Sequence, residues 1–500
     1  MWKIISLSRF LYIYFLRGNL FILKSFSVRQ SSCHKDKDSG LYFMKKIILI
    51  LFMSLSLLNG CNDSQIASTA PTSNAIILGI DQPDVYGPLL SGKRVGLMVN
   101  QSSIDSTGQH AIEKLIALQA KYNFTVTTLF SVEHGLRGNE EAGFGDKDYI
   151  DPATGLQVWS LYGNDANGKR LAHPSEEKLA NVDVVIFDLQ DVGVRFFTYT
   201  ISMHWMMESI QAYGKEFMVF DRPNPNGDSI YGPLLEQENV SNIGIAPVPM
   251  AHGLTSGEFA QMIAGQGWLN GIDNADNRWD LFGLPEYRLP TDKLHVIAMK
   301  NYTHATPYSL PKSPSPNLRT DTAIRMYPSL ALFESTSVNM GRGSDYPHEQ
   351  TGYPDSQFYI NTEYQIDPGL TAFGWPQGGQ YVWGQSYRQE VTGISPQQRK
   401  PSIQPFVQWW FNMEKYGYKT YVSYEQESQY LQNADRYYVI RPAWLAKLVG
   451  SKSFLEELKD ASENNLTEEE TIQQIEAGWQ SGLQAYKVMR QKYNLYQDTI

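Results

Sequence analysis

Between residues 93 and 223 the chain alternates between two patterns of apolar residues. Four apolar runs predict strands buried in a sheet, at residues 95–99, 124–131, 182–191 and 216–223. Apolar residues at helical spacing predict helices over residues 110–122 and 200–214. Strands that alternate with helices are typical of a parallel sheet with helices on its faces. We therefore predict an α/β fold for this part of the chain.

The pattern changes near residue 300. Residues 307–320 are rich in proline and indicate an extended segment that crosses between two parts of the molecule. Residues 351–390 are rich in Tyr, Trp and Gly and show little helical periodicity. A capping box at Thr467 then precedes an apolar stripe that predicts a final helix. We predict an α/β domain over residues 76–300 and a smaller α+β C-terminal domain over residues 301–500.

The first 75 residues indicate export and anchoring. A short basic start at Met44 precedes about a dozen apolar residues, too few to span a bilayer comfortably and typical of a signal peptide. The run ends in small residues and Cys61, which resembles a bacterial lipobox. We predict a signal peptide over residues 44–60, a lipidated Cys61, a flexible tether over residues 61–75, and a wrongly assigned upstream start for residues 1–43. The alternative is a chance cysteine at the end of an uncleaved anchor. The prediction is a periplasmic or cell-surface lipoprotein held in a membrane.

Composition and missing motifs narrow the function. A net charge of −10 argues against nucleic acid as a partner, and two cysteines exclude a disulfide framework and a cysteine-built zinc site. The glycines of residues 135–145 do not open a helix after the first strand, so a dinucleotide site is poorly supported. The histidines lack metal-ligand spacing, and no cofactor or metal is expected. Ser175 and Lys178 match part of a serine acylase motif, but a serine at a helix N-cap explains them better.

Polar side chains follow each predicted strand. The carboxyl ends of parallel strands meet at one edge of the sheet, where ligands commonly bind. Any single set of polar residues could form a turn, but four such sets at one edge favour a binding site. The candidate residues at these strand ends are Asn100; Glu133, His134 and Arg137; Asp188, Asp191 and Arg195; and Asp221, Arg222 and Asn224.

After these exclusions, the candidate residues favour a reaction catalysed by a pair of carboxyl groups. Glycoside hydrolysis commonly uses one protonated carboxyl group and one ionised carboxylate. Glu133 is the best candidate for the acid because a carboxyl group at a strand end can be partly desolvated. The alternative for Glu133 is a salt bridge to Arg137. Glu334 is a second candidate if the smaller domain covers the sheet edge, and Asp191 is a third. The aromatic residues of 351–390 suit a sugar, although packing within a loop-rich domain explains any one of them equally well.

Several long motifs together resemble the exo-β-N-acetylmuramidase family, once known only as a domain of unknown function. They are "SVEHGLRG", "VIFDLQDVGVRFFTY", "FDRPNPNG", "GPLLE", "SPSPNL", "YPSLALFESTSVNMGRGSDYPHEQ" and "RQKYNLY". The resemblance implies a Rossmann-like domain joined to a smaller C-terminal domain, with the site in the cleft between them. It also implies release of N-acetylmuramic acid from the non-reducing end of peptidoglycan fragments, with Glu133 as the leading catalytic candidate.

The muramic sugar carries a lactyl carboxylate, which suits the two-pronged geometry of arginine. Arg137, Arg195, Arg222 and Arg342 are the candidates to bind it. The sequence leaves a retaining, an inverting and a substrate-assisted route open, since the acetamido group of the sugar could itself attack. A lipoprotein that binds murein fragments without cleaving them is the competing function. An esterase or amidase is a distant third because no nucleophile with a base is evident.

Overall fold

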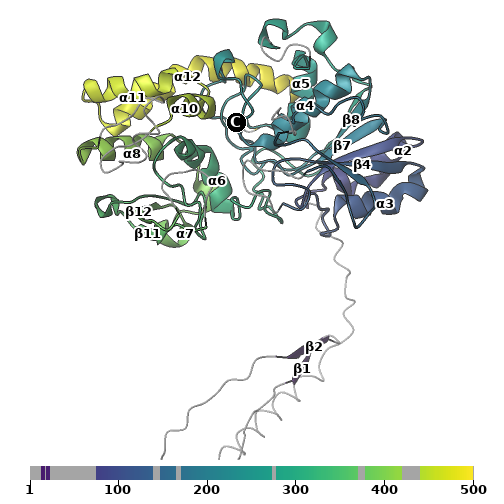
Figure 1. Ribbon diagram of the computed structural model, residues 1–500, viewed down its shortest axis with the longest axis horizontal. Coiled ribbons are helices and arrows are strands. Elements are labelled where there is room, and N and C mark those ends of the chain that lie inside the picture. The colour runs from purple at the N-terminus through teal and green to yellow at the C-terminus, as the bar shows by residue number, and fades with distance from the viewer. Residues whose placement is uncertain are drawn as a thin grey trace, which may run out of the picture. The chain divides into compact units, whose positions relative to one another are not determined.

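The computed structural model describes residues 75–138, 147–164, 171–272, 278–369, 378–418 and 440–498, together with the strands β1 (Ile13–Leu16) and β2 (Asn19–Ile22). The chain forms two compact units, Met1–Ser73 and Asn74–Ile500 (Figure 1). In the first unit, β1 pairs with β2 in an antiparallel hairpin. The predicted signal peptide and Cys61 lie outside the described residues. Among the residues that are described, no helix combines the length and the apolar character needed to cross a membrane.

A seven-stranded sheet forms the centre of the second unit and confirms the predicted α/β fold. Every neighbouring pair in it is parallel except the pair at the β5 edge. Two predicted strands are shorter than expected, since β7 ends at Asp188 and β8 at Phe220. In spatial order the strands are β5 (Tyr149–Ile150), β6 (Gln157–Ser160), β4 (Thr125–Ser131), β3 (Arg94–Val99), β7 (Val184–Asp188), β8 (Glu216–Phe220) and β9 (Leu294–Ile297).

Helices cover both faces of this sheet (Figure 1). α2 (Pro83–Leu90) and α3 (Ala111–Tyr122) lie on one face, and α4 (Thr198–Ala212) and α5 (Ser256–Gln266) lie on the other. The side chains of β7 alternate between the two cores: Val184 and Ile186 join α2 and α3, while Val185 and Phe187 join α4 and α5. This double burial is why the strands read as continuous apolar runs.

A second, smaller sheet is built from the aromatic segment. β10 (Gln350–Tyr353), β12 (Tyr381–Ser386) and β11 (Thr362–Gln365) pair antiparallel in that order. Around it lie α6 (Asp321–Leu330), α7 (Gln389–Thr392), α8 (Gln404–Lys415), α10 (Pro442–Val449), α11 (Ser453–Glu463) and α12 (Glu468–Arg490). Short 3-10 helices are η1 (Gly79–Asp81), η2 (Gln237–Asn239), η3 (Arg278–Leu281), η4 (Pro285–Tyr287), η5 (Ala331–Ser335), η6 (Ser356–Phe358), η7 (Pro396–Gln398) and η9 (Gln491–Tyr493).

Two predictions about helix starts have different outcomes. Thr467 and Glu470 form the expected capping box, with each side chain bonding the backbone of the other residue, at the start of α12. Ser175 does not cap a regular helix. Its hydroxyl accepts from the Lys178 backbone N–H at 3.4 Å within a hydrogen-bonded turn. The local hydrogen bond is therefore the one that a cap would make, but the chain does not continue as a helix.

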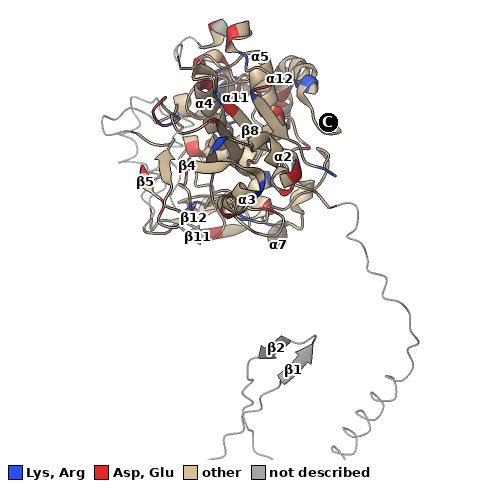
Figure 2. Cartoon of the chain, turned by 90° about the vertical axis from the view of Figure 1, so that its right-hand side faces the viewer, with Lys and Arg blue, Asp and Glu red and all other residues tan. Residues whose placement is uncertain are grey.

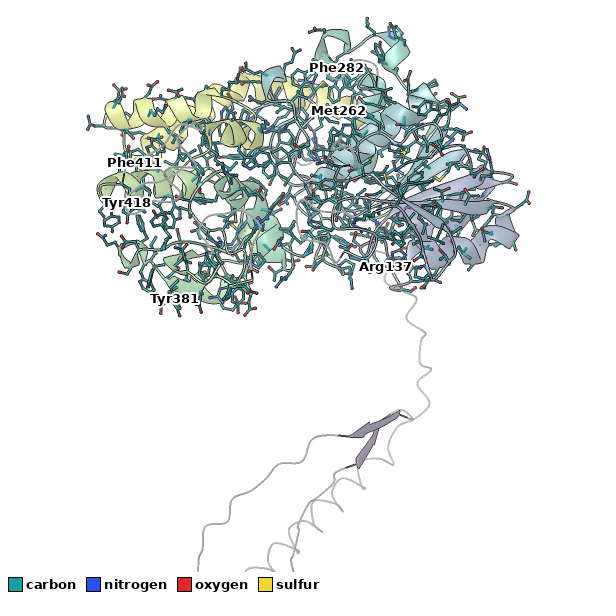
Figure 3. The ribbon with its side chains drawn as sticks, in the orientation of Figure 1. Arg137, Met262, Phe282, Tyr381, Phe411 and Tyr418 are labelled. Carbon is teal, nitrogen blue, oxygen red and sulfur yellow. The ribbon has the colours of Figure 1, made fainter. Side chains whose placement is uncertain are left out.

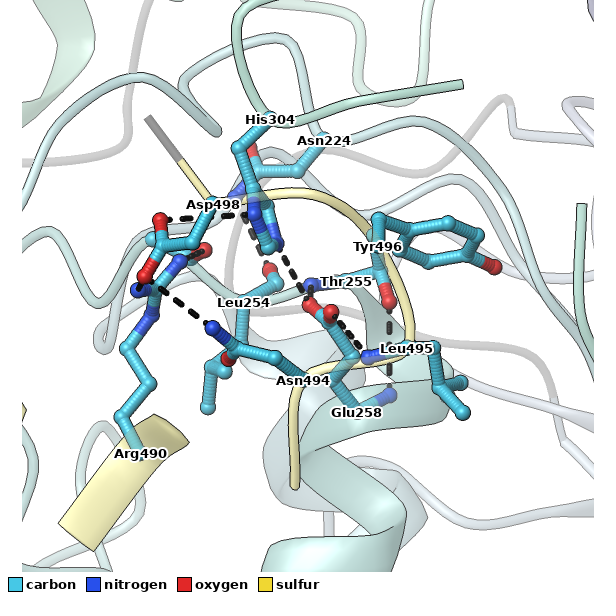
Figure 4. Close-up of polar contacts among 12 residues, drawn as sticks. Asn224, Leu254, Thr255, Glu258, His304, Arg490, Asn494, Leu495, Tyr496 and Asp498 are labelled. Atoms are coloured by element: carbon cyan, nitrogen blue, oxygen red, sulfur yellow. Dashed lines mark hydrogen bonds and ion pairs between the residues drawn. The ribbon is translucent and has the colours of Figure 1, made fainter. Parts of the chain in front are cut away.

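The residues after α12 return to the central sheet (Figure 4). The Tyr496 hydroxyl donates to Asp221 at 2.6 Å, directly after β8. His304 lies between Glu258 and Asp498, with nitrogen-to-oxygen distances of 2.9 and 3.5 Å. Arg490 pairs with Asp498 and donates to the Gly253 carbonyl. The C-terminal segment is thus bonded to the sheet domain, and residues 74–500 form one compact unit. The proposed boundary at residue 300 remains a prediction.

Acidic and basic residues are interspersed along the ribbon of this unit (Figure 2). Arg137 and Tyr381 lie on different parts of it, on the side of the large sheet and on the side of the small sheet respectively (Figure 3). The crossing segment predicted over residues 307–320 has no helix or strand. The side chain of Gln101, at the end of β3, donates to the carbonyls of Ser313 and Pro314. This segment is therefore fixed against the edge of the sheet where the strands end.

Candidate active site

A tight turn after β4 places Glu133 at the sheet edge. His134 and Gly135 both have positive φ angles, of 69° and 76°, and the Gly135 N–H donates to the Val132 carbonyl at 2.9 Å. A histidine with a positive φ angle is uncommon. Backbone strain of this kind clusters at functional sites. Thr198, the first residue of α4, donates its hydroxyl to the Glu133 carboxylate. The helix start and the turn together fix the direction of Glu133.

Glu334 reaches the same place from the other side. It lies on η5, and Arg342 donates to its carboxylate at 2.7 Å. Burial raises the pKa of Glu334, the positive charge of Arg342 opposes the rise, and the negative charge of Glu133 adds to it. The charge of Glu133 is therefore close enough to act on the ionisation of Glu334.

Both carboxyl groups line one cavity of about 170 Å³. Its residues come from the turn after β4, the start of α4, the crossing segment, α6, η5 and α10. Three predicted site residues besides Glu133 are brought together here, namely His134, Glu334 and Arg342. The remaining lining residues are Tyr162, Phe196, Phe197, Thr198, Asn242, Ile243, Ser315, Asn317, Leu318, Tyr327, His348 and Trp444.

His348 is a lining residue that the sequence analysis missed. Its side chain is 1% exposed, and burial, helped by the charge of Arg342, lowers its pKa to about 3. The imidazole is therefore neutral at physiological pH. One ring nitrogen lies 3.2 Å from the Asn317 carbonyl, and the other has no hydrogen-bond partner in the described part of the chain. His348 stands within the quoted motif "SDYPHEQ", but no spacing to another polar residue signalled it.

Arg222 and Asp188 form a buried ion pair away from the cavity lining. Arg222 donates to both carboxylate oxygens of Asp188, at 2.6 and 2.9 Å, and to the Ile104 carbonyl. Both side chains are almost fully buried. The pair fixes the ends of β7 and β8 together, which favours a structural role over contact with a substrate.

Arg195 and Arg137 are also directed elsewhere. Arg195 is buried and donates to the carbonyls of Pro233, Val248 and Leu448. Its burial lowers its pKa to about 9. Arg137 is half exposed and pairs with Asp151 at 3.0 Å. The salt bridge considered in the sequence analysis thus forms with Asp151, and neither arginine lines the cavity.

Asp221, Asn224 and Asn100 hold the strand ends in place. Asp221 accepts hydrogen bonds from Thr255, Tyr496 and the Gly257 backbone. Asn224 donates to the Leu254 carbonyl, and Asn100 accepts from the backbone and hydroxyl of Ser102. All three side chains are buried. The Asn100 bonds are local, as in a turn, whereas the bonds of Asp221 and Asn224 reach residues far along the chain.

Asp191, the third catalytic candidate, does not line the cavity either. One of its oxygens accepts from the Gly193 N–H at 2.6 Å, and the other has no partner among the described residues. Burial raises the pKa of Asp191 to about 7. Gly193 has a φ of 73°, and the Asn224 amide would lie 2.1 Å from any Cβ added there. Asp191 therefore stabilises a turn that only glycine fits.

Known proteins resemble this chain in sequence and in fold. A family profile described as exo-β-N-acetylmuramidase NamZ, N-terminal, matches residues 95–322. Over 313 residues the chain is 35% identical to the peptidoglycan β-N-acetylmuramidase NamZ of Bacillus subtilis. The match covers 61% of this chain and 68% of the Bacillus protein. The chain belongs to the NamZ family of exo-β-N-acetylmuramidases. The resemblance seen in the sequence is thereby confirmed.

Two solved structures share the NamZ-family fold. Both are DUF1343 family proteins from Bacteroides fragilis, and each match covers 85% of this chain and 100% of the other. The first has a TM-score of 0.65 at 31% identity, and the second has a TM-score of 0.59 at 24% identity. The second likeness shows the fold alone. In this member of the NamZ family, residues before and after position 322 both line the cavity, so the site needs more than the matched N-terminal region.

The described residues do not form a metal-binding site. No group of three or more His, Cys, Asp or Glu side chains is arranged there to hold an ion. The cavity instead offers two carboxyl groups, one arginine and two histidines, of which the buried His348 is neutral. These groups suit proton transfer to an uncharged leaving group and recognition of an anion.

Replacing Asp191 by Asn should change how stability depends on pH. The raised pKa means that the Asp191 carboxyl stabilises the fold below about pH 4 and loses that contribution as pH rises through about 7. We expect the free energy of unfolding of the wild type to fall relative to Asp191→Asn between pH 4 and 8, by on the order of 4 kcal/mol at most. Urea unfolding at several pH values measures this difference. The exposed Asp292→Asn is the control, and parallel pH curves for wild type and Asp191→Asn would contradict a protonated Asp191.

Proposed function

We propose that this chain is an exo-acting glycoside hydrolase that releases N-acetylmuramic acid from the non-reducing end of peptidoglycan fragments. Membership of the NamZ family supports this function, as does the 35% identical Bacillus subtilis peptidoglycan β-N-acetylmuramidase. The single observation that carries it is the meeting of Glu133 and Glu334 in one cavity with Arg342. A fragment-binding protein would need the arginine but not two interacting carboxyl groups.

The paired carboxyl groups provide the proton for bond cleavage. Glu133 and Glu334 line the same cavity, so one can act as the acid and the other as the ionised carboxylate. One carboxyl group donates its proton to the glycosidic oxygen, and the C1–O bond breaks with its electron pair leaving on that oxygen. The remaining carboxylate stabilises the positive charge at C1, and water supplies the new C1 oxygen and the proton that restores the acid. Retaining, inverting and substrate-assisted routes all use this first proton transfer.

The size of the cavity supports exo action. Ligand pockets commonly measure roughly 300–1,000 Å³, so a cavity of about 170 Å³ is small for a long saccharide. It suits the terminal sugar alone, with aromatic rings such as Phe197 and Tyr327 around it. The buried neutral His348 adds a hydrogen-bonding nitrogen for a polar group of the sugar.

Arg342 is the arginine that we propose for the lactyl carboxylate. Of the four arginines singled out in the sequence, it is the one on the cavity wall, and it is 8% exposed. It already binds a carboxylate there, that of Glu334. A second anion beside it can share the guanidinium, whose five donors form a planar fork.

We also propose that Cys61 carries a lipid that anchors the protein to a membrane facing the periplasm or the cell surface. The support is the sequence of residues 44–61, with its basic start, apolar run and small residues before the cysteine. Peptidoglycan lies outside the cytoplasm, so a proposed substrate of this kind is consistent with export.

Glu133→Gln should lower kcat by ~10²–10⁴-fold on N-acetylmuramyl-N-acetylglucosamine, because the amide cannot donate the proton. The loss should be smaller on a chromogenic aryl glycoside, whose leaving group needs little protonation. Glu334→Gln serves as the matched variant and should lose activity on both substrates alike if it acts as the ionised partner. Rates on the two substrates, with folding checked by circular dichroism, make the test. If Glu334→Gln instead regains activity on the aryl glycoside, Glu334 is the acid and Glu133 is the ionised partner. Full activity of both variants would refute this site.

Arg342→Ala should raise KM for the aryl N-acetylmuramic acid glycoside and narrow its advantage over the N-acetylglucosamine analogue, which lacks the carboxylate. Removing a charge-assisted hydrogen bond of this kind should cost roughly tenfold or more in kcat/KM. Arg342→Lys should rescue only in part, because lysine lacks the two-pronged geometry. Arg137→Ala is the control, since its partner is Asp151 and it lies outside the cavity lining. An unchanged preference for the muramic sugar in Arg342→Ala would contradict recognition by this arginine.

Lipidation of Cys61 predicts two effects in a bacterial host. Globomycin should cause an uncut precursor to accumulate, and Cys61→Ala should leave the protein without labelled fatty acid. Ser64→Ala, in the predicted tether, is the control and should be processed like the wild type. Metabolic labelling followed by gel analysis reads out both effects. Label on the Cys61→Ala protein would contradict the anchor without bearing on the hydrolase activity.

A further inference from the structure

A second cavity of about 660 Å³ lies next to the proposed catalytic one. Asn317 lines both cavities. The walls of the second cavity come from the crossing segment at Arg319, from the loop that contains Tyr346, and from β11 of the small sheet. An exo-acting enzyme holds only the terminal sugar in its catalytic cavity, and the remainder of the chain must leave that cavity on one side. The larger cavity adjoins the smaller one at this position.

Two arginines of this second cavity have unused hydrogen-bond donors. Arg319 uses its Nε on the Pro316 carbonyl, and Arg388 uses its Nε on the Ser386 hydroxyl. Within the described ranges, neither arginine makes a salt bridge, and their terminal nitrogens have no hydrogen-bond partner. The Arg388 guanidinium lies 3.9 Å above the ring of Tyr346, which orients it. Two oriented guanidinium groups suit a carboxylate.

The other wall residues suit the hydroxyl and amide groups of a sugar. Asp345, Glu363 and Asp367 provide carboxylate acceptors; Glu363 is already bonded to the Trp383 indole and Asp367 to the Gly369 N–H. Tyr346 offers a partly exposed aromatic face. A wall of mixed sign would repel part of a densely anionic ligand. It fits an elongated neutral saccharide that carries an occasional carboxylate.

We propose that this cavity binds the leaving side of the glycan, with Arg319 and Arg388 receiving the carboxylate of the next muramic acid residue along the chain. The inference rests on the proposed function and names how that function selects its substrate. The glycan alternates neutral and acidic sugars, so the sugar directly after the cut is neutral and the one beyond it is anionic. Each turnover therefore uses two carboxylate sites, Arg342 for the sugar released and the Arg319–Arg388 pair for the chain retained.

The test compares substrates that reach the second cavity with one that does not. Arg319→Ala and Arg388→Ala are each assayed on an aryl N-acetylmuramic acid glycoside, on the muramyl-glucosamine disaccharide and on the peptide-free tetrasaccharide. We expect kcat/KM on the tetrasaccharide to fall about tenfold in each variant, while the aryl glycoside and the disaccharide change less than about twofold. Arg388→Lys should restore part of the loss. Arg94→Ala, an exposed arginine at the opposite edge of the large sheet, is the control and should match the wild type on every substrate.

The possible results separate this inference from the proposed function. Wild-type enzyme that cleaves the aryl glycoside but gains nothing from the longer chain, with variants that behave alike on all substrates, would overturn the second cavity as a glycan site and leave the hydrolase function intact. Losses confined to a tetrasaccharide that carries peptide stems would also overturn it, since the occupant would then be the peptide. Wild-type enzyme with no activity on any of the three substrates would refute the proposed function itself.

Discussion

The structure depends on the hydrogen bonds and ion pairs that hold the polar groups buried where the parallel strands end. Asp188 and Arg222 are an ion pair with almost no exposure, and Asp221 is surrounded by Thr255, Tyr496 and backbone N–H groups. Removing one member of such a set leaves an uncompensated buried charge, which costs more than the pair contributes. These contacts therefore favour a single arrangement of the strand ends. Tyr496 comes from the C-terminal segment, so these contacts extend to the far end of the fold (Figure 4).

The same constraint explains where the candidate active site lies. Asp188, Arg222 and Arg195 bond to partners within the protein and do not line the cavity. Glu133 differs because it follows β4 by a tight turn and meets residues from beyond position 322. Those residues keep their position because the C-terminal segment is bonded back to the sheet domain through Tyr496 and Arg490. The site is a product of both parts of the chain and of the contacts that join them.

The sequence predicted those features that have a local cause. Buried strands and amphipathic helices have characteristic periods, and β3, β4, α3 and the Thr467 capping box appear where the pattern placed them. The short strands β5, β6 and β9 were missed, and the strands of the small sheet in the predicted α+β region were not located, because a few residues do not establish a period. Nor could a pattern separate Arg342 from Arg195. Both are arginines in polar motifs, and only the folded chain shows that one lines the cavity while the other binds three carbonyl groups.

Under the proposed function, the contact between Glu334 and Arg342 links recognition to protonation. In the protein alone, Arg342 balances the charge of Glu334, and burial and the charge of Glu133 already raise the pKa of Glu334. A muramic carboxylate that enters beside Arg342 adds a further negative charge to the cavity that holds Glu133 and Glu334. Placing a proton on one of the two glutamates relieves that excess, since a neutral carboxyl group costs far less to bury than a second anion. The anion that distinguishes the substrate would thus help to supply the proton that its cleavage requires. A neutral glucosamine analogue would lack both the ion pair with Arg342 and this added negative charge.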